Sequence, residues 1–280
     1  MAVLSAAPEP ITAAARKVGV LGMIFADAPA DWEELETRVE QILSECGCQT
    51  ERGKRVDLPR GTVDLDVYAR DMTREPNLTI VCECKHWGTA VPKHVVHAFR
   101  TVVDEVGAHV GFIISARGFQ RGAIDAARNT NIELLSWDEF QARFFDRWFE
   151  AMRVKLAAVA DEIFAYSDYF HPRMTSVLHA IPERVDELMT LHQRCSAYAS
   201  TTSYHHLFKP KRASFPLQII DPQSAKITTI TIKDARTYFD VLLRSAAQAT
   251  AAYEAFIAKY QEADAEQARE NDGRDGEPGD

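Results

Sequence analysis

The stretch TVDLDVYARDMTREPNLTIVCECK, residues 62–85, decides the fold of this chain. In its first part, apolar and polar residues alternate, with Val63, Leu65 and Val67 on one face and Asp64, Asp66 and Tyr68 on the other. Strict alternation is typical of a half-buried β-strand, because successive side chains point to opposite faces. After a polar turn with Pro76 and Asn77, LTIVCECK reads as a second strand. We expect the two strands to form a hairpin.

Helical signals flank this hairpin on both sides. Upstream, Asp31 and Glu34 have the spacing of a capping box, apolar residues recur at helical spacing, and Gly47 ends the pattern. Downstream, Pro92 opens a helix with a valine-rich stripe that ends at Gly107. A buried strand HVGFIIS, a helix to about residue 129, a strand IELLS and a long helix from about 137 to 169 follow. The order αβ-β-α-β-α-β predicts an α/β fold, a mixed central sheet flanked by helices.

The remainder of the chain predicts a mostly helical C-terminal region with a short β-hairpin. Helices are expected at about 182–199 and 234–266, and strands near 216–220 and 226–232. We therefore divide the chain into an N-terminal arm at 1–30 with a short helix near 11–18, a mixed-sheet domain at 31–145, a mostly helical region at 146–266 and a tail at 267–280. The tail is acidic and almost without apolar residues, which predicts disorder.

Charge and cysteine content narrow the class of protein. The net charge of -9 argues against a broad, non-specific coating of nucleic acid, although residues 261–280, with eight acidic and two basic side chains, supply six of the nine negative charges. The five cysteines are odd in number and include two C-x-C pairs, which favours reduced thiols in a cytoplasmic protein over disulfides or structural zinc. The apolar run at 18–26 is a poor signal peptide, and we expect no membrane span.

Glu83 and Lys85 carry the strongest chemical signal. At positions i and i+2 of a strand they leave the same face, and an acidic strand precedes them at hairpin distance. Two carboxylates could hold a divalent cation while the lysine lies beside a water or a phosphate oxygen, which is the arrangement that phosphodiester hydrolysis requires. Alone, the tripeptide is equally compatible with a surface ion pair.

In this order, the segments DWEELE, VDLDVYA, VCECKHW and ISARGFQRGAIDAA resemble the Mrr-like restriction endonuclease family of the PD-(D/E)xK nuclease superfamily, over about residues 31–140. The resemblance implies a metal-dependent DNA endonuclease with Mg²⁺ as cofactor, which Mn²⁺ can replace, and a role in restriction or anti-phage defence. It implies the following site: Asp66, Glu83 and the backbone carbonyl of Cys84 as metal ligands, Lys85 as the catalytic lysine, and Glu36 as a supporting acid. The chain departs from the family pattern at two places. Where the family commonly shows glycines directly before the acid of the first strand, this chain has Gly61 followed by Thr62 and Val63, and Glu83 stands where the family often has glutamine.

Several assignments keep an alternative. Asp64 shares the polar face with Asp66 and is the alternate metal ligand, and Glu36 could be a solvated helix acid. Gln120 and Arg121, in a turn before a helix, are predicted to contact DNA, but a turn with a packed Phe119 and a solvated arginine fits equally. In the second region we assign DNA contacts to Lys209, Lys211 and Arg212, with a solvated loop as the alternative. We expect the histidines at 94 and 97 to be partly exposed helix residues and not ligands.

The competing functions are a non-catalytic nucleic-acid-binding or scaffold protein that retains the nuclease fold, and a repair or RNA-directed nuclease. The complete set of Asp66, Glu83 and Lys85 argues against the scaffold. Cutting both strands of DNA requires two active sites, so we expect a homodimer, with the helices at 137–169 and 234–266 as its candidate interface. The sequence leaves open the recognition sequence and any activating partner.

Overall fold

The computed structural model describes residues 23–59, 61–167, 172, 175, 185–192, 217–220 and 227–274. The chain divides into two compact units, residues 1–152 and 153–280. The boundary falls inside one continuous helix, α4 (Trp137–Ser167), seven residues after the boundary expected from the sequence. The two units are described separately below.

The first unit is built on a five-stranded sheet in the order β1-β2-β3-β4-β5. Its strands are β1 (Cys48–Leu58), β2 (Gly61–Asp71), β3 (Leu78–Lys85), β4 (Val110–Ser115) and β5 (Ile132–Ser136). β1, β2 and β3 pair antiparallel, whereas β3, β4 and β5 pair parallel. The mixed sheet flanked by helices confirms the predicted fold class, and the predicted hairpin is the β2–β3 pair.

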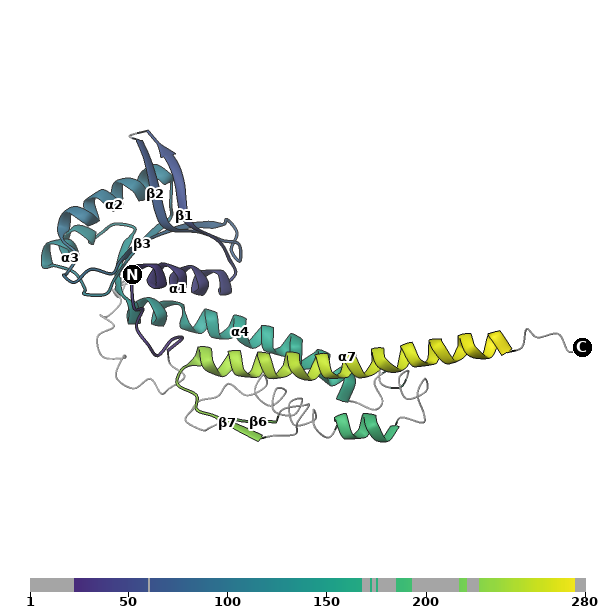
Figure 1. Cartoon of the computed structure of the whole chain (residues 1–280). Coiled ribbons are helices and arrows are strands. Elements are labelled where there is room, and N and C mark those ends of the chain that lie inside the picture. Colours follow the sequence, from purple (N-terminus) through teal and green to yellow (C-terminus); the bar gives the residue numbers. More distant parts are fainter. Residues whose placement is uncertain are drawn as a thin grey trace, which may run out of the picture. The chain divides into compact units, whose positions relative to one another are not determined.

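Three helices and the first part of α4 flank this sheet. α1 (Trp32–Glu45), α2 (Lys93–Val106) and α3 (Arg121–Ala127) follow the expected order. α1 begins as predicted, because Asp31 Oδ1 accepts a hydrogen bond of 2.8 Å from the Glu34 backbone N–H. α2 ends at Gly107, which adopts the left-handed conformation that favours glycine. Figure 1 shows α2 and α3 on one side of the sheet, with α1 on the other side.

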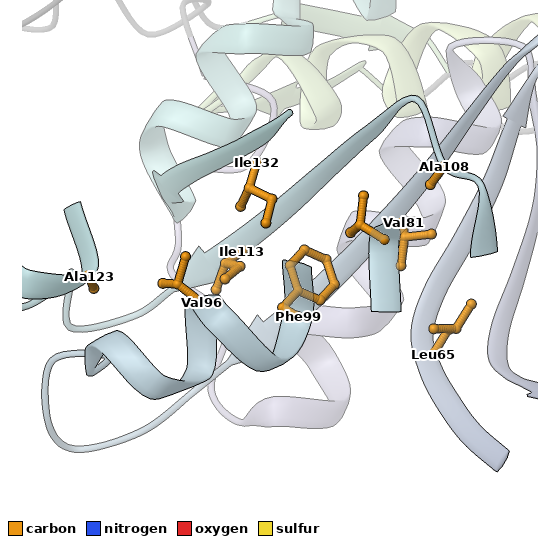
Figure 2. Packing of buried hydrophobic residues seen from close by; sticks show 9 residues of the cluster. Leu65, Val81, Val96, Phe99, Ala108, Ile113, Ala123 and Ile132 are labelled. Carbon is orange, nitrogen blue, oxygen red and sulfur yellow. The ribbon is translucent and has the colours of Figure 1, made fainter. Parts of the chain in front are cut away.

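Alternation along the parallel strands gives the sheet two buried faces. Val81 and Ile113 pack with Val96 and Phe99 of α2 in a cluster of nine buried apolar residues, drawn in Figure 2. On the opposite face, Phe112 packs edge-on against Phe140 and Phe144 of α4, with centroid distances of 6.1 and 5.7 Å. A sheet that is covered on both faces gives strands with nearly continuous apolar sequence, as in VGFIIS.

The strand β1 was not predicted from the sequence. Its residues, CQTERGKRVDL, are mostly polar and largely exposed, so they lack the alternation of apolar residues that marks a half-buried strand. Backbone pairing with β2 along nearly its whole length forms this edge strand. β3 pairs only with residues 67–71 of β2, so the other end of the β1–β2 hairpin continues beyond the sheet, as Figure 1 shows.

A buried ion pair anchors the base of this hairpin to α4. Arg147 donates two hydrogen bonds of 2.6 and 2.7 Å to Asp71, whose side chain is 3% exposed. The same guanidinium donates to the Cys46 carbonyl at 2.8 Å. Although burial raises the pKa of Asp71, its hydrogen bonds from Arg147 and Thr73 lower that pKa to about 2. Asp71 is therefore a structural carboxylate with a fixed partner.

The second unit contains the remainder of α4, a helical segment at 185–192, a two-stranded antiparallel sheet of β6 (Leu217–Ile220) and β7 (Ile227–Ile230), and α7 (Ala235–Arg274). Its core joins Ile163 and Tyr166 of α4 to Leu188 and to Ala246, Ala249 and Tyr253 of α7. α7 continues eight residues beyond the predicted end at 266, into the segment expected to be disordered. Residues 275–280 and the expected helix near 11–18 lie outside the described residues.

Candidate active site

Asp66 and Glu83 lie on two neighbouring strands, directly beyond the last residues that pair. The β2–β3 pairing ends at Val67 and Cys82, so Asp66 is the next residue of β2 and Glu83 is the next residue of β3. The Asp66 carboxylate is fixed there, because its Oδ2 accepts a hydrogen bond of 2.7 Å from the Cys84 backbone N–H. Burial raises the pKa of Asp66, while the Cys84 N–H and the Lys85 charge oppose that rise. Asp66, on β2, is therefore a partly buried carboxylate next to the end of β3.

Glu83 and Lys85 leave the same face of β3, as the sequence predicted, and form an ion pair with side-chain exposures of 24% and 17%. The intervening Cys84 points to the opposite face and is buried. Burial and the Asp66 charge raise the pKa of Glu83 against the influence of Lys85. Burial lowers the pKa of Lys85, but the charge and hydrogen bond of Glu83 raise it overall. The lysine is therefore positively charged at neutral pH.

The charges of Asp66, Glu83 and Lys85 act on Glu36 of α1. Its pKa is raised to about 7, first by burial and then by the Asp66 carboxylate, with a smaller rise from Glu83. The positive charges of Arg52 and Lys85 oppose these effects but do not cancel them. The third acid implied by the family resemblance thus belongs to the same electrostatic group. Arg52, on the unpredicted strand β1, is a member that sequence reasoning missed.

Asp64 lies outside this group. Its carboxylate accepts hydrogen bonds of 2.7 and 3.0 Å from Arg55, directly opposite on β1. The hydrogen bonds from Arg55 lower the pKa of Asp64, and its side chain is 57% exposed. Asp64 belongs to the part of the β1–β2 hairpin that extends beyond β3. Its surroundings are those of a surface ion pair.

The donor chemistry of the site suits a hard divalent cation. Asp66, Glu83 and the Cys84 carbonyl would supply oxygen ligands from two adjacent strands, the type that Mg²⁺ prefers. Burial raises the pKa of all three carboxyls, and the Asp66 charge adds to the rise for Glu36 and Glu83, so a bound cation would favour their ionised forms. In the described part of the chain, however, no three His, Cys, Asp or Glu side chains gather closely enough to enclose a metal ion.

The loops at this end of the sheet carry the other predicted residues. Gln120 precedes α3 and Arg121 begins it, and both side chains are exposed. His86 makes a contact of 3.1 Å with the Pro29 carbonyl, and the histidines at 94 and 97 are exposed on α2. Trp87, which sequence reasoning did not single out, is 42% exposed, with its ring centroid 5.4 Å from Lys85 Nζ. Lys209, Lys211 and Arg212 lie outside the described residues.

One family model matches the first unit. Residues 28–144 match the family model described as restriction endonuclease, Mrr_cat. A comparison with curated proteins gives no match. In the part of the chain that the structure describes, no helix is long and apolar enough to cross a bilayer.

Three solved structures show weak similarity. The first is AF1548, a protein of unknown function, with 14% identity and a TM-score of 0.36, and the match covers 63% of this chain and 98% of that one. The second is VC1899 from Vibrio cholerae, with 20% identity, a TM-score of 0.34 and coverages of 42% and 34%. The third is the DNA modification-dependent restriction endonuclease AspBHI, with 14% identity, a TM-score of 0.25 and coverages of 44% and 36%. The chain thus spans about a third of the length of the last two. The match over residues 28–144 agrees with the resemblance to Mrr-like restriction endonucleases predicted from the sequence, and it supports a nuclease function of restriction type for this part of the chain.

Proposed function

We propose that the first unit is a Mg²⁺-dependent DNA endonuclease that hydrolyses phosphodiester bonds, with Mn²⁺ as an effective substitute. The observation that carries this proposal is the meeting of Asp66, Glu83 and Lys85 where β2 and β3 run together. Asp66 and Glu83, with the Cys84 carbonyl, would hold the cation. When bound, the cation supplies charge neutralisation of the phosphate and a more acidic water.

The chain's own groups would act around that phosphate. Lys85, whose raised pKa keeps it protonated, would donate a hydrogen bond to a phosphate oxygen and stabilise the negative charge that develops on it. Glu36, with a pKa of about 7, would accept a proton from water near neutral pH, where a base of this pKa works best. Asp66 is already oriented by the Cys84 N–H, so no rearrangement of that carboxylate is needed.

The wider assignments rest on the family and on the sequence. We assign nuclease activity to residues 31–145 and target choice or dimerisation to residues 146–266. A homodimer would bring two active sites to the two strands of a duplex. A cytoplasmic role in restriction or anti-phage defence follows from the family resemblance.

Plasmid cleavage by the full chain tests the activity. Wild-type protein should cut in Mg²⁺ or Mn²⁺ and stop in EDTA. Asp66→Asn and Lys85→Ala should each lose at least about 100-fold in rate, the typical contribution of one such group. Asp64→Asn is the matched control on the same strand and should cut within a few-fold of wild type, since Asp64 is paired with Arg55.

Two results would count against the proposal. Equal losses in Asp64→Asn and Asp66→Asn would mean that the strands do not select Asp66. No metal-dependent cutting of plain duplex, methylated duplex, single-stranded DNA or RNA would favour the scaffold alternative. Cutting of RNA alone would retain the site but replace the substrate.

A further inference from the structure

We propose that Trp87, together with Lys93, Arg117 and Arg121, forms a surface that binds an unpaired nucleotide beside the scissile phosphate. The preferred substrate would then be DNA with a single-stranded segment at the cleavage point, such as a fork or an overhang. This inference rests on the proposed function and specifies its substrate class.

Trp87 is placed beside the candidate active site and is not part of the core. It follows Lys85 by two residues, is 42% exposed, and lies with its ring 5.4 Å from the Lys85 ammonium. Lys85 Nζ lies over one face of the Trp87 ring. The other face would stack on a nucleobase while Lys85 contacts the neighbouring phosphate.

The loop that carries Trp87 is held against the loop that follows β4. The Val91 N–H donates to the Gly118 carbonyl at 2.9 Å, and the Gln120 N–H donates to the Val91 carbonyl at 3.0 Å. The Ala116 N–H donates to the Lys85 carbonyl at 3.1 Å. These bonds fix the ends of two loops at the same edge of the sheet, so the surface they present is pre-organised for binding.

Three cations on these two loops and the helices after them lack ionic partners. Lys93, Arg117 and Arg121 are exposed, and none forms a salt bridge with a described residue. Lys93 begins α2 and Arg121 begins α3. The two helix starts are adjacent, because a Cβ on Gly122 would lie 3.6 Å from Lys93 Cβ. Positive charge without a salt bridge to the described residues, on the two loops that carry and adjoin the exposed indole, fits a nucleic-acid backbone together with a base.

The exposed indole selects for unpaired DNA. Within a duplex both faces of each base are covered by its neighbours, so an aromatic side chain can stack only after a base is displaced, which costs energy. A single-stranded nucleotide has no such cost. Because every base has a π-face, this preference would act on DNA structure and not on base sequence.

Binding in EDTA tests this inference without hydrolysis. Fluorescence anisotropy would compare fluorescein-labelled duplex, single-stranded and forked DNA of equal length. We expect the fork to bind at least about ten-fold more tightly than the duplex. Trp87→Ala should weaken fork binding by about five- to 150-fold, the range for loss of one base stack, and leave duplex binding unchanged. Trp87→Phe should retain most of the affinity.

Two further variants sharpen the test. Trp32→Ala removes another exposed tryptophan, 60% exposed on α1, and should change nothing. The triple variant Lys93→Gln, Arg117→Gln, Arg121→Gln should weaken binding of the fork and reduce the salt slope of log K by about two for a single strand. Circular dichroism melting would check that each variant is folded.

The inference is overturned if fork and duplex bind equally, or if Trp87→Ala behaves as Trp32→Ala does. Because no cleavage is required, fork-selective binding without any metal-dependent cutting would refute only the proposed endonuclease. Cutting that ignores Trp87 and DNA structure would refute only the binding surface.

Discussion

Replacing Glu36 with glutamine should stabilise the metal-free protein at neutral and alkaline pH. The pKa of Glu36 is raised from 4.5 to about 7 by burial and by Asp66. An acid whose pKa is raised by folding stabilises the fold only while it is protonated. That contribution is complete below pH 4.5 and is lost as the pH rises through about 7. Glutamine mimics the protonated form at every pH.

The size of the effect follows from the same values. A pKa change from 4.5 to about 7 corresponds to about 3 kcal/mol at 1.36 kcal/mol per pKa unit. Glu36 is only partly buried, so solvent screening reduces this figure, and we expect about 1–2 kcal/mol. For a domain of this size, that is an increase in Tm of roughly 3–8 °C.

The assay is thermal unfolding of wild type and Glu36→Gln in EDTA from pH 4.5 to 8. The difference in Tm should be near zero at the acid end, grow through the interval and level off above about pH 7. Glu33→Gln, an exposed neighbour on α1, controls for loss of a helix carboxylate. A Glu36→Gln protein no more stable than wild type at pH 8 would refute the reasoning that Glu36 shares the charge of Asp66.

Two other substitutions test which contacts stabilise the fold around the candidate active site. Arg147→Met removes two short hydrogen bonds from the buried Asp71 and leaves it the Arg74 contact at 3.4 Å, so urea unfolding should show a loss of about 1.5–3 kcal/mol. Arg143→Met, in the exposed pair with Glu133, should cost under about 1 kcal/mol, and similar losses in the two variants would contradict the anchoring role. Gly111→Ala places a Cβ 2.6 Å from Val103 Cγ2 and 2.7 Å from Phe99 Cε1. Because this overpacks the core, urea unfolding should show about 1–3 kcal/mol of destabilisation. An unchanged urea midpoint would mean that α2 can move away from β4.

Local patterns were enough to predict most of the first unit. The Asp31 cap, the glycine end of α2 and the alternation in β2 are each encoded within a few residues, and each is present in the structure. The β2–β3 hairpin also follows from local sequence, because only a short polar turn separates its strands. These signals were sufficient to bring Glu83 and Lys85 to one face.

Features that depend on partners distant in sequence were not predictable. The strand β1 is polar and is defined by pairing with β2, and the choice between Asp64 and Asp66 depends on where β3 stops. Alternation alone puts both acids on one face. Only the structure shows that Arg55 lies opposite Asp64 and donates to its carboxylate, while the Asp66 carboxylate accepts a hydrogen bond from the Cys84 N–H next to Glu83. The exposure of Trp87 likewise depends on how the β3–α2 loop is held against residues 116–120.

The contrast among the acids of this sheet supports a functional role for the Asp66 group. Asp71 is paired with Arg147 and Arg74, Asp64 is paired with Arg55, and both acids have lowered pKa values. In the Asp66 group three acids share Lys85 and Arg52, and all three pKa values are raised. A site selected only for stability would not crowd carboxylates beyond the cations available to them. A bound divalent cation would supply the missing positive charge, and the Glu36→Gln comparison measures how far burial and the Asp66 charge together disfavour the ionised Glu36.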